Sequence, residues 1–349
     1  MPEIPARRIC VVRLSALGDV IHALAMVNGV RRGYPDAEIT WIVHPVPYQA
    51  VREQPAIDRF VILERGGAAS FLALAKTLKG ERFDLALVPQ VSFKAGLVAA
   101  LLDARVKLGF DFRRSRELHW FFCNAHLPSR PAGHVQEHYL EFLDALGILR
   151  EPVEWNLRFT DGELEWRDAF FARLGRPAVA FVAASAHPEK DWTVEGHARA
   201  MEHVDRVVGM QPLLVGGPSE RERRVADAIV AACRTRVEVA LERPVRHTLL
   251  QLSGSAVVVA PDTGPLHAAV AMGVPTVGLY GMSNPRRVGP FRAYADLLVD
   301  HFTEAGETHA RRVTRPGRMA TITPEEVIAK IDTAVARYVR FGPQGGTQR

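Results

Sequence analysis

Apolar and polar positions in the first half of the chain follow two alternating patterns. Short runs of β-branched and other apolar residues predict buried strands, and between these runs apolar residues recur at helical spacing. Strands that alternate with helices are typical of a parallel sheet covered by helices. The predicted strands are 9–14, 38–43, 59–63 and 84–89, and the predicted helices are 19–32, 47–54, 70–80, 94–104 and 133–148.

The second half repeats the same alternation after a mixed, polar stretch around 150–165. A last helix is predicted over 324–340, where Thr323 suits the N-cap, Pro324 the first turn and Glu326 the closing residue of a capping box. The other predicted strands are 177–185, 211–217, 237–241 and 256–262, and the other predicted helices lie near 195–209, 219–234, 246–253 and 265–272.

The length of the chain favours two domains rather than one. A chain of 349 residues exceeds what a single hydrophobic core usually serves. We place the domains at 1–160 and 161–349, each an α/β domain with a doubly wound parallel sheet. Ligands in such folds bind beyond the carboxyl ends of the strands, so we expect the site in a cleft between the two domains.

Composition and charge narrow the class of protein. Hydrophobic residues make up 48% of the chain, as in ordinary globular proteins, and no run is long and apolar enough to span a bilayer. The N-terminus lacks the apolar segment of a signal peptide, and the three scattered cysteines fit a reducing cytoplasm. The net charge of +5 suits an anionic ligand or an anionic membrane surface, although an arginine-rich proteome explains it equally well.

Several classes of site are disfavoured by what the sequence lacks. Nothing resembles a nucleic-acid-binding motif, a GxGxxG fingerprint or a P-loop. No D-x-D pair and no His, Cys or carboxylate cluster with metal-ligand spacing is present. We therefore expect no metal, no cofactor and no nucleic-acid partner.

The first predicted strand ends in an acidic turn, "RLSALGD" at 13–19. Gly18 can supply the backbone freedom of a tight turn. Asp19 suits the N-cap of the following helix, but a carboxylate held at a cleft-facing turn is also a candidate general base. His22, three residues further on, shares the helix face of Asp19, and we expect it to pack in the core.

The strand before Asp262 leads into "DTGPLHAAVAMGVP". Pro265 suits the first turn of a helix and Gly273 its C-terminal cap, so Thr263 and Gly264 lie where backbone N–H groups are free. Such a helix start can hold a phosphate or diphosphate, whereas the alternative is an ordinary turn capped by Asp or Thr. We expect the Asp262 carboxylate to hydrogen-bond sugar hydroxyls.

Two further strand ends carry candidate ligand contacts. In "ASAHPEKDW", Trp192 can anchor the loop and hold the Lys190 ammonium toward the cleft, where it would neutralise a diphosphate leaving group. In "LLVGGPSERER", Gly216 and Gly217 either admit a nucleotide close to the backbone or form a simple turn.

These segments resemble one family. "RLSALGDVIHAL", "EKDW" with "EGHARAM", and "VVVAPDTGPLHAAVAMGVPTVGLYGMSNPRRVGPF" are similar to segments of the ADP-heptose:lipopolysaccharide heptosyltransferases of glycosyltransferase family nine. "VKLGFDFRRSRELHWFFCN" resembles their acceptor-side segment, and the matches run in order from about residue 9 to 293. Among the subfamilies, "ALGDVIH" is most similar to heptosyltransferase I, which adds the first heptose to the Kdo region of lipid A.

The resemblance implies a fold and a reaction. The fold would be GT-B, with two Rossmann-like domains, and the reaction an inverting, metal-independent transfer of heptose from ADP-heptose to the Kdo or inner-core region of lipopolysaccharide. The N-terminal domain would take the acceptor and the C-terminal domain the donor. The enzyme would be cytoplasmic, with a peripheral contact to the inner membrane, and its oligomeric state is left open.

The resemblance also assigns roles to residues of this chain. Asp19 would be the general base, and the guanidinium groups near the acceptor would meet its carboxylates or phosphates, although a solvated arginine face is the alternative for Arg113 and Arg114. On the donor side the resemblance covers Lys190, Asp262, Thr263, Gly264 and His267. From the residues themselves we add Ser185 and Gly217 on the donor side, and Gly18, Arg116, Arg113 and Arg65 on the acceptor side.

Two departures from the family pattern leave the acceptor open. The segment after the third strand is short, with Arg65 as its only early basic residue, and Ser185 and Ala186 stand where the family usually has two threonines. Heptosyltransferases II and III, or another family-nine transferase, are therefore alternatives. A nucleotide-sugar epimerase or a non-catalytic sugar-binding protein of the same architecture is a more distant one.

Overall fold

The computed structural model describes residues 4–241, 244–341 and 347–348. The chain divides into two compact units, residues 1–158 and 159–349. The boundary expected from the sequence, between 160 and 161, lies two residues further on. Each unit has its own sheet and its own hydrophobic core.

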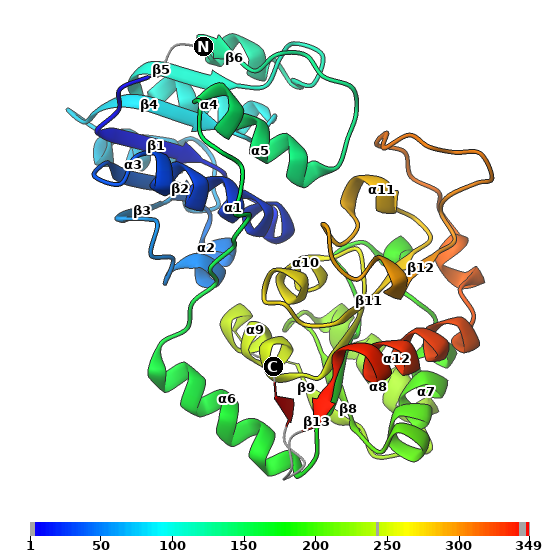
Figure 1. Ribbon diagram of the computed structural model, residues 1–349. Helices are drawn as coiled ribbons and strands as arrows, with labels where there is room; N and C mark the ends of the chain where they lie inside the picture. Colours follow the sequence, from blue (N-terminus) through cyan, green and yellow to red (C-terminus); the bar gives the residue numbers. More distant parts are fainter. Residues whose placement is uncertain (1–3, 242–243, 342–346, 349) are drawn as a thin grey trace. The chain divides into compact units, whose positions relative to one another are not determined.

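The N-terminal unit contains one parallel sheet of six strands in the order β3-β2-β1-β4-β5-β6 (Figure 1). This is the strand order of a Rossmann sheet, in which the chain crosses from one side of β1 to the other at β4. The strands are β1 (Arg8–Val12), β2 (Glu38–Val43), β3 (Arg59–Ile62), β4 (Arg82–Val88), β5 (Asp103–Gly109) and β6 (Ala125–His126). The helices are α1 (Leu17–Gly33), α2 (Pro45–Val51), α3 (Ala68–Thr77), α4 (Phe93–Leu101), the 3₁₀ turn η1 (His119–Phe122) and α5 (Val135–Ala145).

The C-terminal unit repeats this topology with a sheet in the order β12-β11-β10-β7-β8-β9. The strands are β7 (Ala178–Val182), β8 (Gln211–Val215), β9 (Glu238–Ala240), β10 (Val257–Pro261), β11 (Thr276–Tyr280) and β12 (Leu298–Asp300). The longer helices are α6 (Asp161–Leu174), α7 (Val194–His203), α8 (Glu220–Ala232), α9 (Val245–Gly254), α10 (Gly264–Ala271) and α12 (Pro324–Tyr338). The short helical segments are η2 (Pro188–Lys190), η3 (Val204–Val208), α11 (Pro285–Val288), η4 (Ala295–Leu297) and η5 (Arg318–Thr321).

The central strands are largely apolar because helices cover both faces of each sheet. Every residue of β7, β8, β10 and β11 is buried, and so is all of β1 after Arg8. The buried polar residues of the strands include Thr40, Gln211 and Thr276. Most polar side chains lie at the strand ends and in the loops, which is where candidate chemistry has to be sought.

Helix α6 was missed by the sequence analysis, which treated the polar text up to 165 as a boundary segment. Only Phe170 of this helix is fully buried, so hydrophobic periodicity gives almost no signal. A start signal was nevertheless present, because Thr160 and Glu163 form a capping box. The Glu163 carboxylate also pairs with the buried Arg246, at 2.8 Å.

Other differences concern short strands and helix ends. The helix predicted over 94–104 ends at Leu101, and β5 begins at Asp103. Strands β5, β6, β11 and β12 were not predicted. Two and three residues, the lengths of β6 and β12, are too few for a clear periodic signal. The helix predicted over 324–340 has the expected capping box at Thr323 and ends at Tyr338, before β13 (Arg340–Phe341) pairs with β14 (Thr347–Gln348).

Within the described residues, no helix has the length and the apolar character that crossing a bilayer requires.

Candidate active site

The Asp19 carboxylate lies in the first turn of α1, directly beyond the carboxyl end of β1. The N-cap of this helix is Ala16, so the interpretation of Asp19 as the N-cap is wrong. Its Oδ2 atom accepts a hydrogen bond from the Ala16 N–H at 3.4 Å and also pairs with Arg13. The side chain is 38% exposed, and no hydrogen bond to Oδ1 is found within the described residues.

Arg13 is a residue of this site that the sequence analysis did not single out. It follows β1, is only 7% exposed, and donates from Nη1 to the carbonyl oxygen of Pro89 at 3.0 Å. Its guanidinium also lies 5.8 Å from the ring centroid of Tyr139. Buried arginines need acidic partners. The position of Arg13, at the end of an apolar strand and six residues before Asp19, could therefore have predicted that the two side chains pair.

The neighbours of Asp19 on α1 have structural roles. Gly18 is buried in the first helical turn and has no positive φ, so the expected tight turn at this glycine is wrong. His22 packs in the interior as expected, 5% exposed, with Nδ1 at 2.9 Å from Oε1 of Gln136.

Basic side chains gather at the carboxyl edge of the N-terminal sheet. Arg65 follows β3, Lys94 lies in the first turn of α4, and Arg113 and Arg116 follow β5. No hydrogen bond or ion pair to the guanidinium groups of Arg65, Arg113 and Arg116 is found in the described part of the chain, and all three residues are exposed. This edge therefore presents three exposed guanidinium groups, with the exposed carboxylates of Glu64 and Glu117 beside Arg65 and Arg116 in the chain.

Arg114 differs from its two arginine neighbours. Its side chain is 14% exposed and pairs with Asp111 and, at 2.7 Å, with Glu141. The alternative of a solvated arginine face is therefore wrong for Arg114, which holds the loop.

In the C-terminal unit, the loop after β7 is anchored by Trp192 as expected. The indole is 4% exposed and donates from Nε1 to the carbonyl oxygen of Ile322 at 3.0 Å. Two residues earlier, the Lys190 ammonium reaches the end of β10, where Nζ donates to Asp262 at Oδ2 (2.6 Å) and at the backbone oxygen (3.1 Å). The lysine thus joins the ends of two neighbouring strands.

Ser185 is occupied by its own loop. Its Oγ donates to the carbonyl oxygen of His187 at 2.6 Å and accepts from the His187 N–H at 3.0 Å. Its backbone N–H donates to Asp191, and its carbonyl oxygen accepts from Arg221, which also pairs with Asp191. Ser185 therefore shapes the turn that carries Lys190.

Asp262 follows β10, and its side chain is 11% exposed. Its Oδ1 lies 3.1 Å from Nε2 of His267, while Oδ2 binds Lys190. Burial alone would raise the pKa of Asp262, but the hydrogen bonds and charges of His267 and Lys190 hold that pKa well below its usual value. The carboxylate therefore stays ionised and already has partners on both oxygens.

Helix α10 begins beside this carboxylate. Thr263 is its N-cap residue, but the Thr263 hydroxyl donates to the carbonyl oxygen of Pro261 at 3.0 Å and does not cap the helix. Pro265 lies in the first turn and Gly273 adopts a φ of +73° after the last turn, both as predicted. The first N–H groups of this helix are thus left without a side-chain cap, next to an ammonium.

Gly217 forms a closed turn. Its N–H donates to Oε1 of Glu222 at 2.8 Å, and a Cβ atom at this position would lie 2.8 Å from Oε2 of the same carboxylate. The geometry favours the simple-turn interpretation over direct use of this N–H by a ligand.

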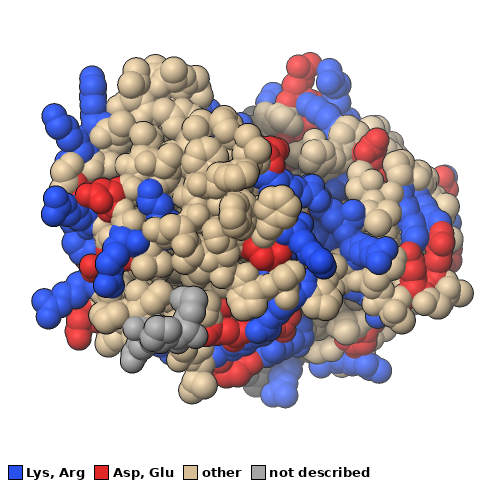
Figure 2. Space-filling view, turned by 90° about the horizontal axis from the view of Figure 1, so that it is seen from above, with Lys and Arg blue, Asp and Glu red and all other residues tan. Residues whose placement is uncertain are grey.

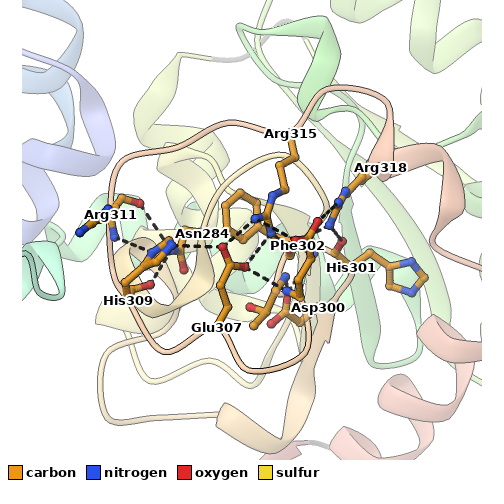
Figure 3. Close-up of polar contacts among 11 residues, drawn as sticks. Asn284, Asp300, His301, Phe302, Glu307, His309, Arg311, Arg315 and Arg318 are labelled. Carbon is orange, nitrogen blue, oxygen red and sulfur yellow. Dashed lines mark hydrogen bonds and ion pairs between the residues drawn. The ribbon is translucent and has the colours of Figure 1, made fainter.

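The long loop after β12 is braced by charge pairs that the sequence analysis did not identify (Figure 3). Arg315 makes two parallel bonds to Glu307, at 2.7 and 2.6 Å, and Arg318 pairs with Glu304. The hydrogen bonds from Arg315 lower the pKa of Glu307 to about 2. Asn284 donates to the carbonyl oxygen of His309 at 2.9 Å, which ties the loop to the residues after β11.

The carboxyl edges of the two sheets offer different chemical groups. One edge offers a carboxylate with an open oxygen and exposed arginines, and the other offers an ammonium beside an uncapped helix start, which suits phosphate. Among the described residues, no group of three or more His, Cys, Asp or Glu side chains could hold a metal ion.

Comparison with known proteins places the chain in a family. Residues 71–316 match the model of glycosyltransferase family 9 (heptosyltransferase). The chain belongs to glycosyltransferase family 9. It is 30% identical over 286 residues to the lipopolysaccharide core heptosyltransferase OpsX of Haemophilus influenzae, with 82% of each chain covered. It is 26% identical over 302 residues to lipopolysaccharide heptosyltransferase 1 of Escherichia coli K12, covering 81% of this chain and 91% of that one.

The same fold is found in a solved family-9 structure. Escherichia coli heptosyltransferase WaaC with ADP-2-deoxy-2-fluoro heptose matches with a TM-score of 0.69 and 20% identity, over 93% of this chain and 99% of that one. The protein is thus a glycosyltransferase, with the GT-B arrangement of two Rossmann-like domains. The higher identity to OpsX means that the comparisons do not assign it to heptosyltransferase I in particular.

The buried carboxylate of this family-9 enzyme should contribute to stability. We expect Asp262→Asn to lower the free energy of unfolding by about 1–3 kcal/mol at pH 7, because Lys190 and His267 lose a charged partner. Because the pKa of Asp262 is lower in the folded protein than the value of 3.8 for an unfolded chain, its ionised carboxylate stabilises the folded state above about pH 3.8. This stabilisation is lost as the pH falls through the pKa of the folded state. The difference between wild type and variant should therefore persist at pH 5 in urea titrations and shrink only below about pH 3.8.

Asp168→Asn is the matched control, because Asp168 pairs with Arg167 on the surface and its side chain is 67% exposed. Its effect should stay within about 0.5 kcal/mol. Equal effects of the two variants would show that the Asp262 pairs add no stability.

Proposed function

We propose that the protein transfers heptose from ADP-heptose to the Kdo or inner-core region of lipopolysaccharide, with inversion and without a metal. The observation that carries this proposal is the pairing of the Lys190 ammonium with the end of β10, beside the uncapped start of α10. The relatives named as lipopolysaccharide heptosyltransferases, and the solved enzyme with an ADP-sugar analogue, support it.

The donor diphosphate would bind at the carboxyl edge of the C-terminal sheet. An ammonium has three N–H donors, and Asp262 accepts two of those of Lys190, so the third is left for a phosphate oxygen. The backbone N–H groups at Thr263 and Gly264 would add donors and the positive end of the α10 dipole. His267 would act through Asp262, whose carboxylate it helps to fix.

The sugar of the donor would be bound by Asp262, beside the diphosphate. A carboxylate has about four lone-pair sites, so the paired oxygens of Asp262 can still accept a hydrogen bond from a sugar hydroxyl. Ser185 and Gly217 would contribute by shaping the loops around the nucleotide, since their own polar groups are already bonded within the chain.

Asp19 would act as the general base through its Oδ1 atom. Arg13 is a positioning residue in this scheme, since its contact with Oδ2 and its bond to Pro89 fix the direction of the carboxylate. An acceptor hydroxyl attacks the anomeric carbon, the bond from that carbon to the phosphate oxygen breaks, and the hydroxyl proton passes to Asp19. ADP leaves with the electron pair, and Lys190 with the α10 N–H groups stabilises its charge.

The acceptor would be held by the basic edge of the N-terminal sheet. Arg65, Arg113 and Arg116 are exposed arginines that can bind carboxylates or phosphates in the bidentate manner of guanidinium groups. Gly18 lies in the first turn of α1, the turn that carries Asp19, and would contribute through that turn. The sequence "ALGDVIH" favours heptosyltransferase I, with Kdo-bearing lipid A as acceptor. The second candidate is a core heptosyltransferase with another acceptor, which the identity to OpsX favours.

Because such an acceptor is anchored by lipid, we propose that the enzyme works as a peripheral protein at the cytoplasmic face of the inner membrane.

ADP release with ADP-heptose and a panel of lipid A acceptors tests this function. We expect turnover with Kdo-bearing lipid A that lacks heptose, and the same rate in EDTA. Turnover only with an already heptosylated acceptor would replace the first-heptose assignment, and loss of activity in EDTA that magnesium restores would overturn the metal-free reaction. ADP-sugar turnover without any acceptor would point to an epimerase instead.

Lys190→Ala should weaken ADP binding about tenfold or more, because a charge-assisted contact to phosphate contributes about 1.5–3 kcal/mol. Titration calorimetry measures this directly. Lys330→Ala is the control, since Nζ of Lys330 also donates to a backbone carbonyl of the C-terminal unit, that of Asp296 at 2.7 Å. Equal affinity of the two variants for ADP would remove Lys190 from the phosphate site.

Asp19→Asn should lower turnover by about two orders of magnitude or more while leaving ADP binding unchanged, because an amide cannot accept the acceptor proton. Steady-state rates at saturating donor measure the effect. Asp58→Asn is the matched control, because Asp58 also pairs with an arginine, Arg31, and accepts a backbone N–H, that of Ile39. Turnover of Asp19→Asn near that of this control would leave Asp19 as a helix-turn residue only.

A further inference from the structure

Large apolar side chains are concentrated on one exposed loop of the N-terminal unit. Phe112, Leu118 and Phe121 are 69%, 64% and 67% exposed and lie within ten residues of one another. Other strongly exposed apolar residues, such as Leu72 and Leu149, stand alone in the sequence. Single exposed apolar residues are ordinary, but a cluster marks an interaction surface.

The loop is held in this conformation by its own contacts. The ring of Trp120 lies 5.9 Å from that of Phe112 and 5.4 Å from that of Phe121, in edge-to-face packing. Glu117 and Leu118 adopt φ values of +49° and +64°, which cost energy for residues other than glycine. The chain thus maintains a strained backbone that leaves Leu118 in the solvent.

Helix α4 extends the same surface. Phe93, at its start, is 43% exposed, and its ring packs edge to face on Phe122 at 5.9 Å. The Glu117 carboxylate accepts the Phe93 N–H at 2.9 Å, so the loop and the helix are fixed to each other. We name Phe93, Phe112, Leu118 and Phe121 the apolar patch.

The charge around the apolar patch is positive. Arg113 and Arg116 are exposed on the same loop, and Lys94 follows Phe93. Of the acidic groups nearby, Asp111 is paired with Arg114, while Glu117 accepts the Phe93 N–H and keeps its negative charge, so three basic groups stand against one unpaired carboxylate. Figure 2 shows one face of the molecule, with a broad area free of charged residues and both basic and acidic residues around it.

We propose that the apolar patch docks the protein on an anionic lipid bilayer. Phenylalanine and leucine side chains would enter the headgroup region, with Trp120 beside them, and Arg113 and Arg116 would bind lipid phosphates, as in other interfacial proteins. The charge complementarity selects an anionic bilayer over a neutral apolar partner. This inference rests on the proposed function only in that a lipid-anchored acceptor lies in the same membrane.

Vesicle binding tests the proposal without donor or acceptor. Wild-type protein should co-sediment with vesicles of phosphatidylethanolamine and phosphatidylglycerol, and much less with phosphatidylcholine alone. Phe112→Ser/Phe121→Ser should lower the partition coefficient about tenfold or more, because two apolar side chains no longer leave water. Leu72→Ser/Leu149→Ser, which removes equally exposed apolar residues elsewhere, should bind as wild type does.

The charge contribution has its own pair of variants. Arg113→Gln/Arg116→Gln should lower binding to the anionic vesicles about tenfold and reduce its dependence on salt. Arg82→Gln/Arg224→Gln changes the net charge equally, and both of these side chains are at least 70% exposed, so binding should be retained. Equal losses in the two double variants would show that only the net charge matters and would overturn the assignment to this loop.

Two results would overturn the docking surface itself. One is wild-type protein that does not bind the anionic vesicles, or patch variants that bind like their controls while circular dichroism shows them folded. The other is a lipid-free dimer in light scattering that dissociates in Phe112→Ser/Phe121→Ser, which would make the patch a contact between two copies. Phe112→Ser/Phe121→Ser should retain turnover with a delipidated acceptor. If the wild-type protein shows no turnover with that acceptor, the result counts against the proposed function and leaves the docking surface untouched.

Discussion

The buried carboxylate of Asp262 is the point on which the donor-side edge of the C-terminal unit depends. It connects the loop that carries Lys190, the end of β10 and, through His267, the body of α10. A single ionised group can do this because burial removes competing water and so strengthens each of its contacts. The cost of burying the charge is offset only while both partners are present, so the loop, strand and helix hold one geometry together.

The N-terminal unit uses the same device with the signs reversed. There the buried group is the guanidinium of Arg13, fixed by the Pro89 carbonyl and the ring of Tyr139, and the exposed partner is the Asp19 carboxylate. Both pairs lie where a largely apolar parallel strand ends, because charged side chains are rarely buried within a strand that is covered on both faces. The topology of the sheet thus decides where reactive groups can lie, and the buried member of each pair decides how the reactive member points.

The sequence was most informative where helix and strand signals are strong. The central strands, the capping box at Thr323 and the start of α10 at Pro265 follow from local rules, and the strand-end positions of Asp19, Lys190 and Asp262 follow from the alternation of elements. Partners distant in the sequence could not be predicted. Lys190 and Asp262 are 72 residues apart, and nothing local indicates that they touch.

Helix α6 shows the complementary case. Of its large apolar side chains only Phe170 is buried, while Leu164, Trp166, Phe171 and Leu174 are partly buried, so its apolar face is weakly marked in the sequence. Its first turn is held by a pair that local rules cannot predict, because Arg246 lies 83 positions away from Glu163. Gly18 and Gly217 show a related limit of the sequence: glycine permits unusual backbone and close approach, but only the neighbours decide whether either is used.

The net charge is a poor guide to partners unless paired arginines are first set aside. Arg114, Arg246 and Arg315 are each bonded to carboxylates of the chain and hold loops or helices in place. An excess of +5 over the whole sequence could therefore have meant nothing for binding. What gives it meaning is its distribution: the exposed arginines Arg65, Arg113 and Arg116 all follow strands of one sheet at one edge. Positive charge that is local and uncompensated creates a potential that anionic groups sense at a Debye length of about 8–10 Å, whereas charge spread over paired residues does not.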